Sequence, residues 1–420
     1  MEENLMGVMD VNRVSIFQKS RNLLKFMGPA FMVSVAYVDP GNFATNIAGG
    51  SQFNYSLIWV ILLSNLMAIF LQFMSAKLGI ATDKNLCEAC AEVFSRKVNW
   101  FFWIVAELAA MATTIAEFLG GALGFYLLLR IPLTIAGILT ALITLILTYM
   151  QKYGQKLVER SIIALLSVIS IAYTVEMFLA KPDWNQVAIH TVMPQFVSSD
   201  AILVAVGMLG ATVMPHVIYL HSQLVQERNI DKSVAAKKRH FRMEKIDIVV
   251  AMNIAFIINA AMVIVSAAVF YKNGIAVDSI EQAHKSLQPL LGNLSSTAFG
   301  IALLASGFSS SAVGTMAGET VMDGFVNIKF PAYFKRMVTM IPAMVIILLG
   351  INAMKALVIS QVCLSFALPV AIIPMLIITS KKALMKDFVN SKKVKIIGII
   401  ITSTIVLLNV LLIFSTLFRG

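Results

Sequence analysis

The sequence predicts an all-α integral membrane protein with eleven transmembrane helices, ten of them arranged as two inverted five-helix repeats. Hydrophobic residues make up 59% of the 420-residue chain and charged residues only 13%, and the mean hydropathy is +0.84. Runs of about 20 apolar residues follow one another along the chain, which is the pattern of membrane-spanning helices. Two of these runs, the first and the sixth, are interrupted by turn residues at matching places. These observations exclude an ordinary soluble domain.

The apolar runs define the expected spans in order. They cover residues 24–48, 54–79, 99–129, 131–151, 158–180, 201–225, 246–271, 294–325, 334–351, 354–380 and 396–418. Residues 1–23 are too polar for the core of a signal peptide, so we expect a cytoplasmic N-terminal segment and a first helix that stays in the mature protein. Residues 24–420 then form one transmembrane domain. Its first repeat is expected at about 24–180, its second at about 201–380 and an extra helix at about 396–418.

The positive charge of the chain indicates its orientation in the plasma (inner) membrane. The net charge is +11, with 33 Lys and Arg residues. With the N-terminus inside, all of them lie on the cytoplasmic side except Arg130, Lys181, Lys272, Lys285, Lys355 and Arg419. This distribution satisfies the positive-inside rule, places the C-terminus outside, and makes a nucleic-acid partner unnecessary. The cluster Lys237-Lys238-Arg239 is a candidate contact for anionic lipid.

The two interruptions predict a polar site in the middle of the membrane. The first is Asp39-Pro40-Gly41-Asn42, and the second runs from Gly210 through Met214-Pro215-His216. Hydrocarbon offers no partner for a freed N–H or C=O, and a carboxylate at that depth costs at least ~2.5 kcal/mol. The broken spans are the first and the sixth, five positions apart in the order of spans, and this odd offset gives the two copies opposite orientations. Sodium-coupled amino-acid transporters have this inverted-repeat arrangement, with the site between the repeats.

The residue types at the breaks suit a divalent transition-metal cation. Asp39 and Asn42 lie three residues apart across an unwound turn, so their side-chain oxygens can converge on one point. These hard ligands suit Mg²⁺, Ca²⁺ and Mn²⁺, whereas the soft thioether of Met214 favours Mn²⁺, Fe²⁺ and later metals. Freed carbonyls near Ala36 and Ala211 complete the predicted shell. The competing interpretation is structural: Asp39 and Asn42 are good helix caps, and Met214 is a packing residue.

Proton binding is the second chemistry that these residues suggest. Asp39 is a candidate acceptor, because metal binding and protonation of one carboxylate compete directly. His216 and His221 lie further along the sixth span. They are interpreted either as carriers of protons or as hydrogen-bonded structural groups.

The two signatures resemble those of the NRAMP family of divalent metal transporters, which have Asp-Pro-Gly-Asn in the first helix and Met-Pro-His in the sixth. The resemblance extends over residues 28–50, 106–124, 207–222, 305–325 and 360–374. It implies eleven or twelve helices in the amino-acid/sodium symporter fold, and import of Mn²⁺ or Fe²⁺, commonly with protons. It maps the metal site onto Asp39, Asn42 and Met214 with the carbonyls of Ala36 and Ala211, and adds Gln361 from the tenth helix. It also implies a proton route through His216, Glu117, Glu107 and Arg336.

The sequence departs from the family pattern on the proton route. Threonine occupies position 114, where many relatives have aspartate, and threonine does not titrate. Glu319 stands where the family often has glutamine, and we expect it to be solvated. Lys335 beside Arg336 replaces a frequent arginine pair. These differences leave proton coupling open.

The function predicted from the sequence is secondary active import of Mn²⁺, Fe²⁺ and related metals by alternating access. No nucleophile–base pair or phosphate-binding loop of the G-x-x-x-x-G-K-[ST] type is present, so we expect a transporter without enzymatic activity and without a cofactor. The expected partners are divalent metal ions, protons and the lipid bilayer, and a monomer is sufficient. The alternatives are a Mg²⁺ transporter or an amino-acid/sodium symporter on the same scaffold, and a non-transporting receptor.

Overall fold

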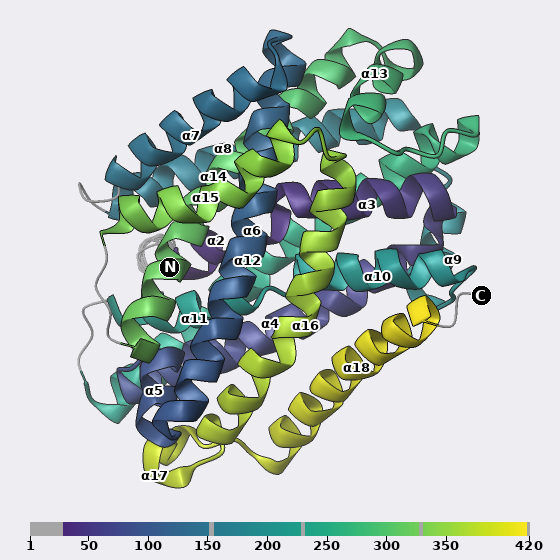
Figure 1. Cartoon of the computed structure of the whole chain (residues 1–420). Helices are drawn as coiled ribbons and strands as arrows, with labels where there is room; N and C mark the ends of the chain where they lie inside the picture. The colour runs from purple at the N-terminus through teal and green to yellow at the C-terminus, as the bar shows by residue number, and fades with distance from the viewer. Residues whose placement is uncertain (1–27, 151–154, 228–231, 327–330, 418–420) are drawn as a thin grey trace, which may run out of the picture.

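The computed structural model describes residues 28–150, 155–227, 232–326 and 331–417, and every regular element within these ranges is a helix (Figure 1). Eight helical stretches in this part of the chain are long and apolar enough to cross a membrane. The predicted all-α, multi-pass membrane class is therefore confirmed. The expected N-terminal segment 1–23 and the start of the first span lie outside the described residues.

The elements of the first half follow the expected spans closely. They are α2 (Pro29–Ser34), η1 (Ala36–Val38), α3 (Pro40–Phe53), η2 (Asn54–Leu57), α4 (Ile58–Thr82), α5 (Leu86–Val93), α6 (Arg96–Leu129), α7 (Leu133–Met150) and α8 (Gln155–Ala180). The first span thus consists of α2, η1 and α3, and it ends at Phe53 rather than near residue 48. The short turn η2 separates it from the second span.

The second half begins with a short helix and continues through the second broken span. Its elements are α9 (Trp184–Val192), α10 (Ser199–Thr212), α11 (Pro215–Leu224), η4 (Val225–Glu227), α12 (Val234–Val269), η5 (Tyr271–Asn273), α13 (Ile280–Leu291), α14 (Asn293–Val326), α15 (Ala332–Leu348), α16 (Ala353–Thr379), α17 (Lys382–Met385), η6 (Lys386–Phe388) and α18 (Lys392–Leu417). Helix α12 begins at Val234, well before the expected residue 246. The side chain of Ser233 caps it, and its first turns carry the basic cluster Lys237-Lys238-Arg239, which precedes the expected span.

Four short α-helices among the described residues lie outside the expected spans and were not predicted: α5, α9, α13 and α17. The first three begin at a side-chain cap, which is Asn85, Asp183 or Ser279. At α5, Asn85 and Glu88 form a reciprocal capping box, which is a signal that the sequence does contain. Hydropathy alone does not detect such short amphipathic helices, because their apolar residues are too few to form a membrane span.

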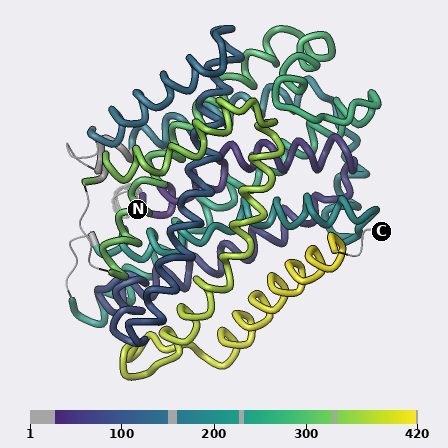
Figure 2. Tube along the Cα trace, viewed as in Figure 1, coloured from purple at the N-terminus to yellow at the C-terminus, as the bar shows by residue number. Residues whose placement is uncertain are grey.

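The broken helices run through the body of the bundle, whereas the last helix lies along its outside (Figures 1 and 2). In the most apolar part of Ser199–Leu224, 89% of the residues are buried, compared with 28% in Lys392–Leu417. Close packing of α14 on α6 depends on glycine: a Cβ at Gly307 would lie 2.6 Å from the backbone nitrogen of Gly121. The broken helices that carry the predicted site therefore lie at the centre of the bundle.

A candidate metal site at the two helix breaks

The first break is an extended residue between two short helices. Asp39 has φ −80° and ψ 169°, and Pro40 begins α3 in the first helical position, where a missing N–H has no cost. The backbone carbonyls freed by the break accept bonds from neighbouring helices: Tyr37 O from Asn259 Nδ2 at 2.6 Å, and Val38 O from Ser306 Oγ at 2.6 Å. Side chains of α12 and α14 thus satisfy the unwound backbone.

The second break has the same construction. Helix α10 ends at Thr212, Val213 and Met214 are extended, and Pro215 begins α11. Met214 has φ −97° and ψ 126° and is fully buried. The structure therefore interrupts both spans at the prolines that the sequence singled out, and it places a candidate ligand, Asp39 or Met214, directly before each proline.

One amide group joins the two breaks. Asn42 Nδ2 donates to Asp39 Oδ1 at 2.9 Å and to the carbonyl oxygen of Ala211 at 3.0 Å. The backbone N–H of Asn42 also donates to Asp39 Oδ1 at 2.8 Å. Two of the predicted oxygen ligands, one from each broken helix, therefore face a common point that a hydrogen-bond donor occupies. The Asn42 amide nitrogen is held there by two acceptor oxygens, and a cation would be held by the same oxygens.

Three buried oxygens around this point have no hydrogen-bond partner among the described residues: Asp39 Oδ2, Asn42 Oδ1 and Gln361 Oε1. All three residues have no exposed surface. Gln361 of α16 lies between the breaks, because a Cβ at Gly41 would be 2.0 Å from its Nε2 and a Cβ at Gly210 would be 2.0 Å from its carbonyl oxygen. Buried polar groups are normally paired, so unpartnered acceptors at one place indicate a site for a cationic ligand.

The candidate shell is mixed in its chemistry. Within the described ranges, no group of three or more His, Cys, Asp or Glu residues is arranged to hold a metal. Asp39 is the only carboxylate among the six predicted ligands, beside amide oxygens, backbone carbonyls and the Met214 thioether. Ala36 begins the single turn η1 immediately before the first break. The set thus combines hard oxygen ligands with one soft thioether.

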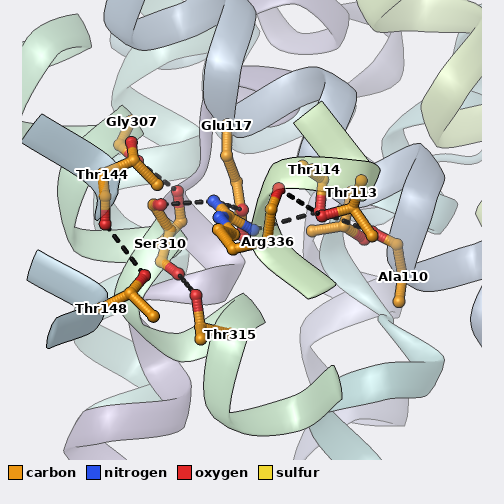
Figure 3. A network of polar contacts seen from close by, with 12 residues as sticks. Ala110, Thr113, Thr114, Glu117, Thr144, Thr148, Gly307, Ser310, Thr315 and Arg336 are labelled. Atoms are coloured by element: carbon orange, nitrogen blue, oxygen red, sulfur yellow. Dashed lines mark hydrogen bonds and ion pairs between the residues drawn. The ribbon is translucent and has the colours of Figure 1, made fainter. Parts of the chain in front are cut away.

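A buried ion pair joins Glu117 of α6 to Arg336 of α15 (Figure 3). Arg336 of α15 donates from Nη2 to Glu117 Oε2 at 2.8 Å and from Nη1 to Thr114 Oγ1 at 3.1 Å, and Ser311 Oγ also accepts from Nη2. Helix α6 brings this pair next to the site, because a Cβ at Gly120 would lie 2.0 Å from Pro40 Cγ. The structure thus brings Glu117 and Arg336 together beside Asp39, with Thr114 bonded to the same guanidinium.

Glu107 is paired separately, with the neighbour of Arg336. Lys335 Nζ lies 3.4 Å from Glu107 Oε2 and also donates to the carbonyl of Gly318. A cavity of about 20 Å³, bounded in part by Thr114, Arg336, Lys335 and Glu319, lies between the two pairs. That volume accommodates about one water molecule. Glu319 is exposed, as expected from the sequence.

The two histidines of α11 belong to different surroundings. His216 Nδ1 lies 3.3 Å from Thr113 Oγ1, next to Thr114, and its Nε2 has no hydrogen-bond partner within the part of the chain that the structure describes. His221 Nδ1 instead lies 2.5 Å from Gln72 Oε1, and its Nε2 lies 2.9 Å from Glu244 Oε1. The structure therefore brings His216 towards the Glu117–Arg336 pair but places His221 in a second buried network.

This second network contains residues that the sequence analysis missed. Gln72 of α4 also donates to the hydroxyl of Tyr37 in η1, so the chain of contacts from Glu244 reaches the first helix break. Asp247 Oδ2, one turn further along α12, accepts from the backbone N–H of Gly28 and Ala30 at 3.0 and 3.1 Å. For Gln72 and Asp247 the available signal was an amide or ionisable side chain within an expected apolar span. Glu244 precedes the expected span 246–271, so hydropathy gave no such signal for it.

The chain is similar to known proteins over nearly its whole length. The model of the family "Natural resistance-associated macrophage protein-like" (Nramp) matches residues 30–415. The divalent metal cation transporter MntH of Caldanaerobacter subterraneus subsp. tengcongensis is 64% identical over 94% of both chains. A crystal structure of the Eremococcus coleocola manganese transporter, in complex with an aromatic bis-isothiourea substituted compound, is 33% identical with a TM-score of 0.84, over 94% of this chain and 86% of that one. Mhp1, a nucleobase-cation-symport-1 family transporter, shares the fold at 15% identity and a TM-score of 0.59, over 93% of this chain and 92% of its own.

Proposed function

The chain belongs to the Nramp family and transports divalent metal ions, and from this premise we propose that it imports Mn²⁺ and Fe²⁺ by alternating access at the site between the two helix breaks. The observation that carries the proposal is the cluster of unpartnered oxygens on Asp39, Asn42 and Gln361 around an amide that links both breaks. Rotation of the Asn42 amide by half a turn replaces its donor by its free oxygen. Asp39, Asn42 and the Ala211 carbonyl then all present oxygens to one ion.

Met214 supports a transition metal over Mg²⁺ as the substrate. Its thioether is fully buried at the start of α11, in the break that also contributes the Ala211 carbonyl. A thioether contributes little to a bond with Mg²⁺ or Ca²⁺ but stabilises Mn²⁺, Fe²⁺ and later ions. An amino-acid substrate fits less well, because the Asp39 carboxylate repels a substrate carboxylate.

The proposed architecture has eleven spans, an N-terminus in the cytoplasm and two inverted repeats whose first helices are both broken. The matched construction of the breaks at Pro40 and Pro215 supports it. Movement of the inner half of the first helix requires that its polar contacts break. These are the bonds of Gly28 and Ala30 to Asp247 and the contact of Tyr37 with Gln72. Metal bound at Asp39 changes the charge at the end of this segment, which couples occupancy to the movement.

Proton coupling is the less direct part of the proposal. A proton released when metal binds Asp39 has the Glu117–Arg336 pair beside it, and the Glu107–Lys335 pair lies further along α6. Thr114 does not titrate, but its hydroxyl lies at the cavity that accommodates about one water. This arrangement supports a proton route that passes through a water molecule beside Thr114, the position at which the family resemblance implies aspartate in many relatives.

Uptake of Mn²⁺ into proteoliposomes that contain a pH-sensitive dye tests the proposal. The wild-type protein is expected to accumulate Mn²⁺, whereas Asp39→Ala is expected to abolish uptake, because the site loses its only charged ligand. Uptake by Asp39→Ala at the wild-type rate would refute the assignment of the site. Acidification of the lumen together with Mn²⁺ uptake would support proton coupling independently of the site assignment.

A further inference from the structure

A groove on the surface of the bundle lies between α16 and α18, the helix outside the proposed repeats. Its volume is about 380 Å³, within the ~300–1,000 Å³ range of small-molecule sites. Its walls include Ile373 and Ile377 from α16 and Ile399 from α18. Ser380 and Lys395 line it where α16 ends and α18 begins. The groove thus has apolar walls and a polar, cationic end, and it is complementary to an amphipathic ligand with a negatively charged headgroup.

The polar end of the groove has a large excess of positive charge. Between residues 380 and 400 the chain has one acidic residue, Asp387, and the lysines Lys381, Lys382, Lys386, Lys392, Lys393 and Lys395. Asp387 lies 3.6 Å from Lys238 of α12, and none of these lysines has a carboxylate partner among the described residues. The first turn of α18 adds the partial positive charge of a helix N-terminus beside Lys392.

The neighbouring basic cluster on α12 makes a useful contrast. Lys237 donates to Asp83 Oδ2 at 2.8 Å and to the carbonyl of Ala81 at 3.1 Å, and Lys238 is the residue that faces Asp387. Of the Lys237-Lys238-Arg239 cluster singled out in the sequence, two members are therefore engaged within the protein. The unmatched charge, together with a groove to receive an acyl chain, is at α17 and α18.

We propose that this groove binds an anionic phospholipid, with an acyl chain between α16 and α18 and its phosphate held by Lys395, Lys392 and the Ser380 hydroxyl. A zwitterionic headgroup would leave the surplus of lysines uncompensated, whereas a phosphodiester of net charge −1 neutralises part of it. The assignment to the cytoplasmic leaflet rests on the proposed orientation of the chain, but the binding site itself does not.

The lipid would act on the helix that carries a predicted ligand. Helix α18 is bonded to α16 through Asn409, whose Oδ1 accepts from Ser365 Oγ at 2.6 Å and whose Nδ2 donates to Ser365 O at 2.9 Å. Gln361 lies one turn before Ser365. A lipid in the groove, which lies nearer the C-terminal end of α16 than these bonds, would stabilise the packing of α18 on α16. The role of α18, the helix outside the proposed repeats, would then be to hold this lipid against α16.

Native mass spectrometry of the full-length protein, incubated with dioleoyl-phosphatidylglycerol or dioleoyl-phosphatidylcholine, tests this proposal. We expect the wild type to retain phosphatidylglycerol in preference, and the double variant Lys392→Gln/Lys395→Gln to bind it at least about tenfold more weakly, since each lysine near a membrane surface contributes about fivefold. Lys181→Gln is the matched control, because Lys181 borders another apolar groove, of about 680 Å³, between α8 and α12. Equal retention by the double variant and the control would overturn the proposal.

A second pair of variants tests the acyl-chain part without changing charge. Ile377→Trp fills the proposed groove, whereas Ile257→Trp fills the groove between α8 and α12. We expect only Ile377→Trp to lower phosphatidylglycerol retention severalfold, with both proteins still taking up Mn²⁺. Equal binding of the two lipids by the wild type, or displacement of the lipid by glycerol 3-phosphate alone, would contradict an anionic phospholipid as the occupant.

Discussion

Asn42 and Ala211, 169 positions apart in the chain, are joined by a hydrogen bond of 3.0 Å from the amide nitrogen to the carbonyl oxygen. The same nitrogen donates to Asp39, so one side chain holds both broken helices in register around a shared point. The bond explains how two breaks that are distant in sequence form one site. Asn42 therefore helps to locate the candidate site as much as the Asp39 carboxylate does.

Replacement of Asn42 by Ala removes this link and one of the proposed oxygen ligands. We expect Mn²⁺ uptake at low metal concentration to fall by at least about tenfold, the lower end of the loss seen even for outer partners of metal ligands. Concentration-dependent ⁵⁴Mn²⁺ uptake into proteoliposomes measures it. Asn46→Ala is the control, since Asn46 lies one turn further along α3 and bonds to Asn259 instead. Similar losses in both variants would argue for a general effect on α3.

The thioether of Met214 is expected to determine selectivity rather than turnover. In Met214→Ala, Mn²⁺ transport should persist, while Ca²⁺ or Mg²⁺ should begin to compete, because the remaining oxygen ligands suit hard cations equally well. Competition of each ion against Mn²⁺ uptake measures the change. Met208→Ala controls for lost volume, since Met208 is also fully buried but packs against Gly49. Unchanged selectivity in Met214→Ala would remove the role proposed for this residue.

The sequence predicts where the site lies better than it predicts what surrounds it. Pro40 and Pro215 begin α3 and α11, where the missing N–H of proline has no cost, so both interruptions predicted from the sequence are confirmed by the structure. Pro342, Pro369 and Pro374 lie inside helices, so proline alone does not mark such a break. The early start of α12 at Val234 was missed, because hydropathy detects the part of a helix in lipid but not its extension into water. The partners of His221 were missed for another reason. Gln72 and Glu244 come from different helices, and sequence spacing does not report which side chains meet.

Gly210 is expected to tolerate no side chain. A Cβ there would lie 2.0 Å from the carbonyl oxygen of Gln361 and 3.0 Å from the backbone nitrogen of Ser365. Because both are backbone atoms, α10 would have to move away from α16, which costs about 1–3 kcal/mol or more. Gly210→Ala should therefore lower the Tm in detergent and abolish Mn²⁺ uptake. Gly207→Ala should be nearly neutral, since its nearest contact would be a Thr45 methyl group at 3.2 Å. Equal Tm values and equal Mn²⁺ uptake in the two variants would show that the close approach of α10 to α16 at Gly210 is not required for stability or transport.

Because Glu117 and Arg336 form a buried ion pair, we expect a second substitution at Glu117 to restore the stability that a substitution of Arg336 removes. Arg336→Met leaves the Glu117 carboxylate buried without its partner, and breaking a buried pair in this way costs about 3–5 kcal/mol. The single variant should therefore unfold at a markedly lower temperature. The double variant Glu117→Gln/Arg336→Met leaves no charge and should recover most of the Tm, but not proton movement with the metal. Thermal unfolding and the internal pH dye measure the two effects. Without recovery of Tm, the arginine would have to stabilise the fold through packing instead.

Thr114 is the position where a single substitution should alter proton movement. Its hydroxyl accepts from Arg336 and faces the cavity that accommodates about one water. Thr114→Asp introduces a carboxylate within reach of the same guanidinium, so we expect more protons to enter per Mn²⁺ ion than in the wild type, with metal selectivity unchanged. Simultaneous recording of ⁵⁴Mn²⁺ uptake and lumenal pH gives this ratio. Thr114→Asn has nearly the same size without the charge and should resemble the wild type. An equal proton-to-metal ratio in Thr114→Asp and Thr114→Asn would show that this position does not control coupling in this chain.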